Sequence, residues 1–248
     1  MIEIKTPQEI LKIKRSCALV AELLEELEKL IVPGVTTREL DEFAEDYIRR
    51  KRAIPAFKGY RNYPASICTS VNEVIVHGIP DDTKLKEGEI IGIDVGVLMD
   101  GYYGDAAKTF PVGKVQQQYL HLIQITKESL HIGIEQIKEN NRIGDLSHAI
   151  QKHVERNGYN VIRDFVGHGV GIRLHEDPKI PNYGEPSTGP RLKTGMVLAI
   201  EPMVTMGSYE VEILPDQWTA RTKDGSYSAH FEHTVAVTHT EALILTTT

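Results

Sequence analysis

Two stretches of this 248-residue chain repeat one another, and the repeat constrains the fold more than any other feature of the sequence. LKEGEIIGIDVGVLM (residues 85–99) aligns without gaps with LKTGMVLAIEPMVTM (residues 192–206), so that Asp94 falls on Glu201. Chance similarity between two buried strands could explain this match alone, but a helical pattern in the first half also recurs in the second at nearly the same offset. The two matching offsets favour a duplicated fold, in which equivalent acids meet on a pseudo-twofold axis.

The length and composition are those of a globular domain. We expect one domain over residues 1–248, with halves of approximately 1–112 and 113–248, because a chain of this length can bury a full core. The net charge of −7 is spread without a long basic block, which argues against nucleic acid as a ligand. The sequence contains neither a secretory signal nor a long apolar span, so we expect no membrane association. Cys17 and Cys68 are the only cysteines, which indicates reduced thiols and a cytoplasmic protein.

Local patterns predict a mixture of helices and antiparallel strands. Capping boxes begin the first two helices, at Thr6 with Glu9 and at Thr36 with Glu39. The predicted helices cover about residues 7–32, 37–52, 115–139 and 144–157, the last closed by Gly158. Strands are predicted at about residues 65–76, 89–98, 102–110, 196–206, 209–214 and 229–238. The chain is therefore expected to be an α+β protein.

Asp100-Gly101 lies between two of these strands and is a strong signal for a two-residue type I′ hairpin turn. The register of that hairpin pairs Asp94 with Ala107 and places Asp94 and Asp105 on the same face. Their Cα atoms should then be about 7 to 8 Å apart, within reach of shared ions. A three-residue loop would instead put the two acids on opposite faces.

Glu201 and Glu232 are also acids within apolar, strand-like runs, VLAIEPMV and AHFEHTVAV. A buried carboxylate without a partner is costly, and neither lysine nor arginine stands beside any of the four acids in these runs. Two divalent ions would balance the four charges. A donor set of carboxylate oxygens and one histidine suits Mn²⁺, Fe²⁺ or Co²⁺ at least as well as Zn²⁺. We therefore predict a dinuclear metal site, with solvated acids on an outer face as the alternative.

The segment FVGHGVGIRLHEDP contains two histidines, His168 and His175, among three glycines. The glycines make a helix improbable, so the segment is predicted to be a loop or an irregular strand. The helical zinc motif His-Glu-x-x-His is absent, because Lys179 stands where its second histidine should fall. The glycines either let the backbone approach other groups closely or supply positive φ angles.

The motifs IDVG, GYYGDAAKTF, GHGVGIRLHEDP, AIEPM and FEHTVAVT together resemble the type I methionine aminopeptidases, over essentially the whole chain. The resemblance implies the pita-bread fold, in which two pseudo-twofold halves form an antiparallel sheet covered by helices. It also implies five metal ligands, one in each motif: Asp94, Asp105, His168, Glu201 and Glu232. The chain has no room for the helical insertion of type II enzymes and lacks a zinc-finger extension, so it resembles the short bacterial form.

The resemblance implies removal of an N-terminal methionine from nascent proteins and peptides whose second residue is small. A water or hydroxide that bridges the two metal ions would attack the carbonyl after the first residue. Glu201 would act as a ligand and as a proton carrier. His77, in SICTSVNEVIVHGIP, would lie near the scissile nitrogen, and His175 would lie near the oxyanion.

The resemblance also implies a pocket for the methionine side chain and a weaker cation site. The pocket positions fall on Phe57, Tyr60, Tyr63, Cys68, Leu174 and Trp218, with ordinary packing as the alternative for the aromatic members. Phe57 and Leu174 depart from residues often found at these positions. A monovalent cation would bind near Asn72, Val74 and Ser228.

Two other functions compete with this interpretation. Proline-directed peptidases share the five ligands but carry an additional N-terminal domain, and a binding protein could use the same scaffold without catalysis. We favour a monomeric cytoplasmic aminopeptidase that uses two ions of Co, Mn, Fe or Zn. The resemblance makes the ribosome a candidate partner.

Overall fold

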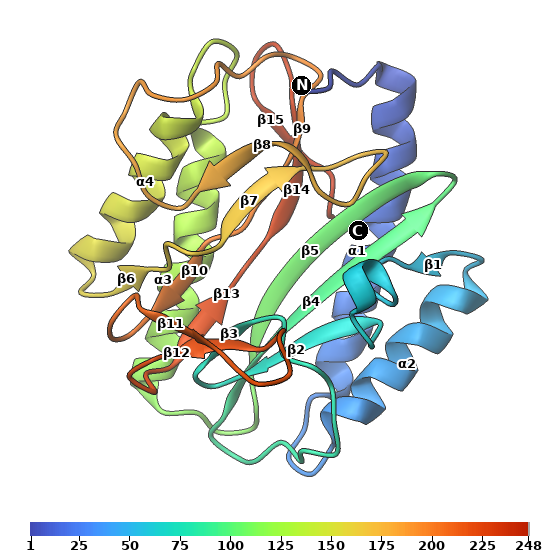
Figure 1. Cartoon of the computed structure of the whole chain (residues 1–248), viewed down its shortest axis with the longest axis vertical. Helices are drawn as coiled ribbons and strands as arrows, with labels where there is room; N and C mark the ends of the chain where they lie inside the picture. Colours follow the sequence, from blue (N-terminus) through green and yellow to red (C-terminus); the bar gives the residue numbers. More distant parts are fainter. Residues whose placement is uncertain (248) are drawn as a thin grey trace.

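The structure is a computed structural model that describes residues 1–247; Thr248, the end of the predicted second half, lies outside the described residues. Its helices are α1 (Pro7–Leu30), α2 (Thr37–Arg50), α3 (Gln117–Glu135) and α4 (Ile143–Arg156). Figure 1 shows α1 and α2 beside the strands of the first half, and α3 and α4 on the opposite side of the molecule. In the described part of the chain, none of the helices is both long enough and apolar enough to span a membrane.

The predicted helices are all present, and the first two begin with the predicted signals. The Thr6–Glu9 and Thr36–Glu39 capping boxes both form, and Gly158 adopts a φ of 82° just after α4. α2 and α4 each contain 14 residues, and their first residues are 106 positions apart, as the repeat predicts. α3 begins without a side-chain cap at Gln116 and is shorter than the predicted run.

The strands form four small antiparallel sheets. In the first half they are β1 (Ile54–Pro55), β2 (Ile67–Val71), β3 (Val74–Val76), β4 (Ile90–Met99) and β5 (Tyr102–Pro111), with a short 3₁₀ turn η1 (Tyr60–Asn62) after β1. In the second half they are β6 (Asn160–Val161), β7 (Val166–Gly169), β8 (Glu176–Pro181), β9 (Val197–Ile200), β10 (Met203–Thr205), β11 (Val211–Ile213), β12 (Ala220–Thr222), β13 (Ser228–His230), β14 (His233–Val237) and β15 (Ala242–Ile244). The chain is therefore an α+β protein, as predicted.

The β4–β5 hairpin has the predicted register. Asp94 pairs with Ala107, and Asp105 pairs with Gly96. Asp100 and Gly101 have φ angles of 51° and 80°, the left-handed conformations that a type I′ turn requires at both central positions. The two acids therefore share one face of the hairpin, as predicted.

Three predicted strands are each split into two strands in the structure. The 65–76 run turns at Asn72, where φ is 53°, between β2 and β3. The 196–206 run breaks at Glu201-Pro202, and the 229–238 run breaks at Phe231-Glu232. At the last two breaks the chain passes from one sheet to another, so Glu201 and Glu232 lie at strand ends rather than within strands.

Each half has its own apolar core. In the first half, α1 and α2 pack on β4 and β5, and in the second half α3 and α4 pack on β9 and β10. The halves meet where β14 lies against β5. There the Thr234 hydroxyl donates to the Asp105 carbonyl at 2.7 Å and accepts a hydrogen bond from the Asp105 amide at 3.3 Å. The seam between the halves therefore passes directly beside one of the predicted metal ligands.

Candidate active site

The strand ends at the seam are held by hydrogen bonds between the two halves. The amide of Glu232 donates to the Ala107 carbonyl at 2.8 Å. Thr109 accepts from the His230 amide at 2.9 Å and donates to the His230 carbonyl at 2.8 Å. These bonds fix the backbone on which Glu232 and His230 project their side chains.

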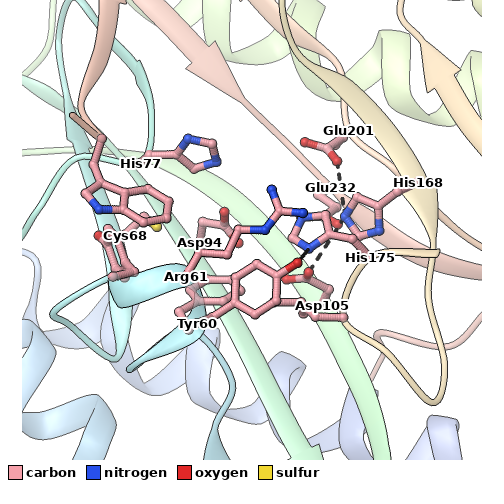
Figure 2. A pocket seen from close by; sticks show the side chains of 14 residues that line it. Tyr60, Arg61, Cys68, His77, Asp94, Asp105, His168, His175, Glu201 and Glu232 are labelled. Carbon is pink, nitrogen blue, oxygen red and sulfur yellow. Dashed lines mark hydrogen bonds and ion pairs between the residues drawn. The ribbon is translucent and has the colours of Figure 1, made fainter. Parts of the chain in front are cut away.

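The five predicted metal ligands line one cavity of about 120 Å³. Figure 2 shows their side chains converging on this cavity from both halves of the chain. Ligand atoms of Asp105, His168 and Glu232 lie within 4.8 Å of one another, and His168 Nε2 is 3.5 Å from Glu201 Oε1. Asp105 and Glu232 are each only 3 % exposed. The cluster is therefore compact and largely shielded from water.

The carboxylates of this cluster lack enough positive charge among the described residues. Burial, together with the nearby charge of Glu201, raises the pKa of Asp94 to about 7, and burial raises the pKa of Glu201 to about 7. Burial and neighbouring carboxylates hold the pKa values of Asp105 and Glu232 well above their ordinary range. One oxygen each of Asp94, Asp105 and Glu232 is buried without a hydrogen-bond partner. Buried carboxyl oxygens without partners fit divalent cations, which would displace their protons.

His168 is oriented as a metal ligand would be. Its Nδ1 is 2.9 Å from the Gly169 carbonyl, which can only accept a hydrogen bond, so Nδ1 carries the proton. The lone pair of Nε2 in the neutral ring then faces Asp105 Oδ2, at 4.0 Å, and Glu201. Fixing the tautomer through the second ring nitrogen is the usual way in which proteins prepare a ligating histidine.

The three glycines around His168 allow close packing rather than positive φ angles. None of Gly167, Gly169 and Gly171 has a positive φ. A Cβ at Gly167 would lie 2.4 Å from the Ala199 carbonyl oxygen, and one at Gly169 would lie 2.3 Å from that of Asp177. Gly167 and Gly169 therefore allow close approach of neighbouring backbone, and Gly171 leaves space for the Lys5 side chain.

His175 stands at the mouth of the cavity. Its Nδ1 is 2.9 Å from the Tyr60 hydroxyl, and its ring lies 4.2 Å from the ring of His168. Desolvation, His168 and the charge of Arg61 lower the pKa of His175, so the ring is neutral at physiological pH. A neutral imidazole can donate a hydrogen bond to an oxygen and can also exchange a proton.

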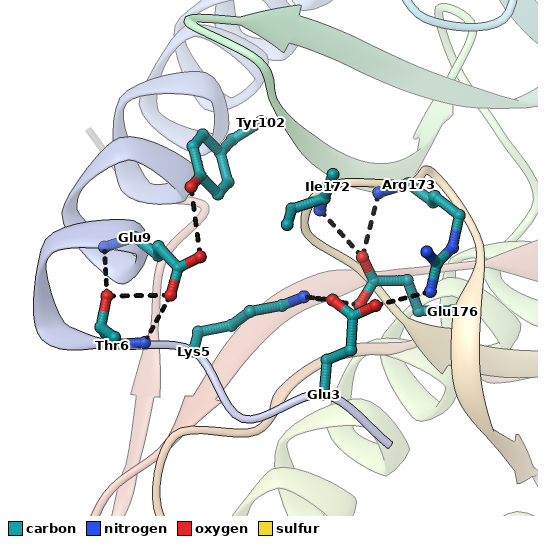
Figure 3. A network of polar contacts seen from close by, with 8 residues as sticks. All are labelled: Glu3, Lys5, Thr6, Glu9, Tyr102, Ile172, Arg173 and Glu176. Carbon is teal, nitrogen blue, oxygen red and sulfur yellow. Dashed lines mark hydrogen bonds and ion pairs between the residues drawn. The ribbon is translucent and has the colours of Figure 1, made fainter. Parts of the chain in front are cut away.

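The loop before His175 is tied to the N-terminal segment, as Figure 3 shows. Glu176 accepts hydrogen bonds from the amides of Ile172 and Arg173 at 2.8 and 3.0 Å. Lys5 Nζ lies 2.8 Å from Glu176 and 2.6 Å from Glu3, and the Lys5 and Glu176 side chains are 2 % and 3 % exposed. A buried ion pair therefore anchors the segment that carries His175.

The remaining predicted substrate contacts also line the cavity. These are His77, Phe57, Tyr60, Tyr63, Cys68, Leu174 and Trp218. Trp218 stacks edge-on against Tyr63, with ring centroids 5.0 Å apart, and His77 contacts Trp218 and Phe165 edge-on. Burial and the nearby His230 lower the pKa of His77 to about 4. The wall opposite the carboxylates is thus apolar and aromatic.

The residues of the predicted monovalent-cation site lie on adjoining strands. The Ser228 amide donates to the Asn72 carbonyl at 2.8 Å, and the Ser228 hydroxyl donates to the Val204 carbonyl at 3.0 Å. The Asn72 side-chain oxygen accepts from the Ile90 amide at 3.1 Å. With Val74, these residues stay a predicted site.

Two side chains at the cavity were not predicted from the sequence. His230 is buried, and its Nε2 lies 3.6 Å from Glu201 Oε2. Its position two residues before Glu232 in an alternating run was a signal that could have identified it. Arg61 also lines the cavity, but a single arginine in an irregular segment carries no comparable signal.

The sequence pattern of metallopeptidase family M24 matches residues 11–239. The chain belongs to this family. It is 52 % identical to methionine aminopeptidase 1 of Bacillus subtilis over 99 % of both chains. The solved methionine aminopeptidase structures from Rickettsia prowazekii and Thermotoga maritima superpose with TM-scores of 0.99 and 0.98, at 42 % and 51 % identity, over the whole of each chain. The predicted resemblance to the methionine aminopeptidases is confirmed.

Membership of a metallopeptidase family implies a divalent metal, and the buried Asp105, His168 and Glu232 provide a candidate site for it. The donor set fits this requirement, because it offers carboxylate oxygens without partners and an imidazole nitrogen with a fixed tautomer.

Proposed function

We propose that this enzyme removes the N-terminal methionine from nascent proteins and peptides whose second residue is small. One observation carries the proposal: four carboxylates, of which Asp105 and Glu232 are buried, and one oriented histidine share a cavity with an aromatic pocket. The relatives that match over nearly the full chain are named methionine aminopeptidases, which supports the same substrate.

The five side chains Asp94, Asp105, His168, Glu201 and Glu232 would hold two divalent ions of Mn, Fe, Co or Zn. When bound, such ions lower the pKa of a water molecule, bind the substrate and stabilise negative charge on the carbonyl oxygen. The buried carboxylates would keep the ions in place, and the hydrogen bond from His168 to Gly169 would hold the imidazole in register.

The protein side chains would perform the other steps. Glu201 lines the cavity beside the other proposed ligands, so a carboxylate oxygen that is not bound to metal would take a proton from water and pass it to the leaving nitrogen. His175, held by the Tyr60 hydroxyl, would donate a hydrogen bond to the scissile carbonyl oxygen. His77, on the opposite wall, would contact the scissile nitrogen.

The pocket formed by Phe57, Tyr60, Tyr63, Cys68, Leu174 and Trp218 would receive the methionine side chain. An unbranched thioether makes favourable contacts with aromatic rings. Burial raises the pKa of the Cys68 thiol, so this group is a neutral part of the wall. We further propose the monovalent cation near Asn72, Val74 and Ser228, and a monomer that acts in the cytoplasm on chains emerging from the ribosome.

The test is kcat/KM, measured with Mn²⁺, for peptides that begin Met-Ala, Met-Leu, Leu-Ala and Ala-Pro. We expect Met-Ala to be the best substrate and Met-Leu to be about a hundred-fold poorer, because displacing the carbonyl by about 1 Å has an effect of that size. Leu-Ala should be disfavoured less strongly, since small differences in an apolar pocket are worth about 1 to 3 kcal/mol. A preference for Ala-Pro would instead indicate a proline-directed peptidase, and no turnover of any peptide would indicate a binding protein.

A further inference from the structure

Arg61 places a positive charge at the mouth of a cavity that is otherwise built from acids, histidines and aromatic rings. It lies in η1, and its side chain is solvent-exposed. Figure 2 shows the Arg61 side chain extending from this turn toward His175, and its charge contributes to the lowered pKa of His175. The guanidinium therefore stands beside the route by which a peptide reaches the carboxylates.

The backbone holds Arg61 in an unusual conformation. Arg61 and the following Asn62 have φ angles of 49° and 70°, a region that residues other than glycine adopt infrequently. Hydrogen bonds within the turn fix this geometry: the Asn62 amide donates to the Gly59 carbonyl at 3.2 Å, and the Tyr63 amide donates to the Tyr60 carbonyl at 2.9 Å. Such conformations persist only where many surrounding contacts hold them, and they are concentrated at functional sites.

The guanidinium of Arg61 has no anionic partner in the part of the chain that the structure describes. Among residues 1–247 it forms neither an ion pair nor a hydrogen bond, and its carbon lies 5.4 Å from the centre of the Tyr60 ring. By contrast, Lys58, three residues earlier, pairs with Glu45 at 2.6 Å. An arginine stacked on a ring keeps its planar array of donors free for a carboxylate from outside the chain.

We propose that Arg61 binds a carboxylate of the substrate downstream of the scissile bond, and so favours peptides with an acidic third residue. This inference rests on the proposed function. The first side chain would fill the aromatic pocket and the second must be small, so the third is the first side chain free to reach the mouth. Without Arg61, the four carboxylates of the site would repel an acidic peptide whenever the metal charge does not fully offset them.

The carboxylate has two sources, which the test separates. One is the side chain of an acidic third residue, and the other is the C-terminal carboxylate of a short peptide. The peptides Met-Ala-Glu-Ser and Met-Ala-Gln-Ser are compared as C-terminal amides, so that only the glutamate side chain differs in charge. The tripeptide Met-Ala-Gln is then compared as free acid and amide, which isolates the terminal carboxylate.

In the Mn²⁺-loaded enzyme at low salt, we expect kcat/KM for the Glu amide to exceed that for the Gln amide about three-fold, the range for a partly exposed ion pair. Arg61→Gln should bring this ratio to one or below, whereas Arg61→Lys should keep a preference for Glu. Lys58→Gln is the matched control and should leave the ratio unchanged. A ratio of two substrates does not depend on the fraction of active protein, so partial misfolding of a variant cannot imitate the result.

Equal rates for the Glu and Gln amides in the wild-type enzyme, or a ratio that survives Arg61→Gln, would overturn the role of Arg61 while leaving methionine removal intact. If only the free-acid tripeptide is preferred over its amide, the Arg61 guanidinium binds the C-terminal carboxylate of short peptides. That result would overturn the preference for an acidic third side chain. Absence of methionine release from every peptide would overturn the proposed function and this inference with it.

Discussion

The imidazoles of His168 and His175 lie next to one another but face different partners. His168 is 8 % exposed and directs Nε2 at two carboxylates, while His175 is held by Tyr60 at the mouth. Sequence spacing alone could not distinguish these environments. The structure therefore supports different roles for two histidines of one short motif.

Replacing each histidine with alanine should separate metal binding from turnover. His168→Ala removes a proposed ligand and should weaken metal affinity about ten- to a hundred-fold or more, by analogy with changes to groups that support metal sites. His175→Ala should keep the metal affinity and lose turnover, by about a hundred-fold if a single transition-state hydrogen bond is lost. Calorimetric titration with Mn²⁺ and peptide kinetics measure the two effects. Equal metal affinities in the two variants would refute this division.

The four carboxylates should make metal binding strongly dependent on pH. The pKa values of Asp94 and Glu201 are about 7 in the folded, metal-free protein, whereas an unfolded carboxyl titrates near 4. Between these values the folded state holds more protons, so the contribution of these groups to stability is present at low pH and falls as the pH rises through 7. A bound metal must displace those protons, so metal affinity should rise as the pH rises.

We therefore expect Mn²⁺ to raise the melting temperature more at pH 8 than at pH 5.5. Each proton displaced should weaken the apparent affinity about ten-fold for each pH unit below 7. Thermal melting with and without Mn²⁺ at both pH values checks this, and calorimetry in two buffers of different ionisation enthalpy counts the protons released. The His175→Ala variant should show the same larger rise in melting temperature with Mn²⁺ at pH 8 than at pH 5.5. A metal-induced shift that is equal at the two pH values would contradict the raised pKa values.

At the scale of elements, the loop between β7 and β8 depends on a segment far away in the sequence. Lys5 lies before α1, yet its ammonium pairs with Glu176, next to His175. Burial by itself would lower the pKa of Lys5, but hydrogen bonds from Lys5 to Glu176 and Glu3 raise it overall. Lys5 is therefore charged at physiological pH, and its charge supports the geometry of the loop.

Lys5→Met should destabilise the protein by about 3 kcal/mol, because it leaves the buried Glu176 carboxylate without its cation. It should also lower kcat while metal affinity stays unchanged, since His175 would lose its anchored loop. The exposed Lys14 of α1 provides a matched control, and Lys14→Met should change neither quantity. Urea unfolding and peptide kinetics measure both. If the Lys5→Met variant is less stable but keeps full kcat, the Lys5–Glu176 ion pair stabilises the fold and does not position His175.

Most elements could be predicted because their signals are local. Capping boxes mark the starts of α1 and α2, and Asp100-Gly101 fixes the turn and the register between β4 and β5. The breaks at Asn72, Glu201 and Phe231 could not be predicted in the same way, because an apolar run does not reveal where the chain leaves one sheet for another. The segment with β7 and β8 was predicted only as a loop or an irregular strand, because the glycines of β7 obscure its strand pattern; neighbouring backbone requires them rather than their own conformation.

At the scale of the whole molecule, acids separated by more than a hundred residues in the sequence line one cavity, as the predicted repeat requires. α2 and α4 have the same length and begin 106 positions apart. Asp94 and Glu201, which the repeat aligns at a nearly equal separation, line the same cavity. The site could thus be predicted as a set of acids in apolar, strand-like runs. His230 and Arg61 could not be predicted with it, because their roles depend on how the two halves approach each other and on an irregular turn.

We propose that the two halves together hold two metal ions that are required for methionine release. The most direct test removes metal with a chelator, returns Mn²⁺ stepwise without oxygen, and measures bound metal and methionine release from a Met-Ala peptide at each step. We expect the metal-free protein to release no methionine and activity to return as metal is bound, with binding complete at two ions per chain. Full methionine release from protein that holds no measurable metal would contradict the account.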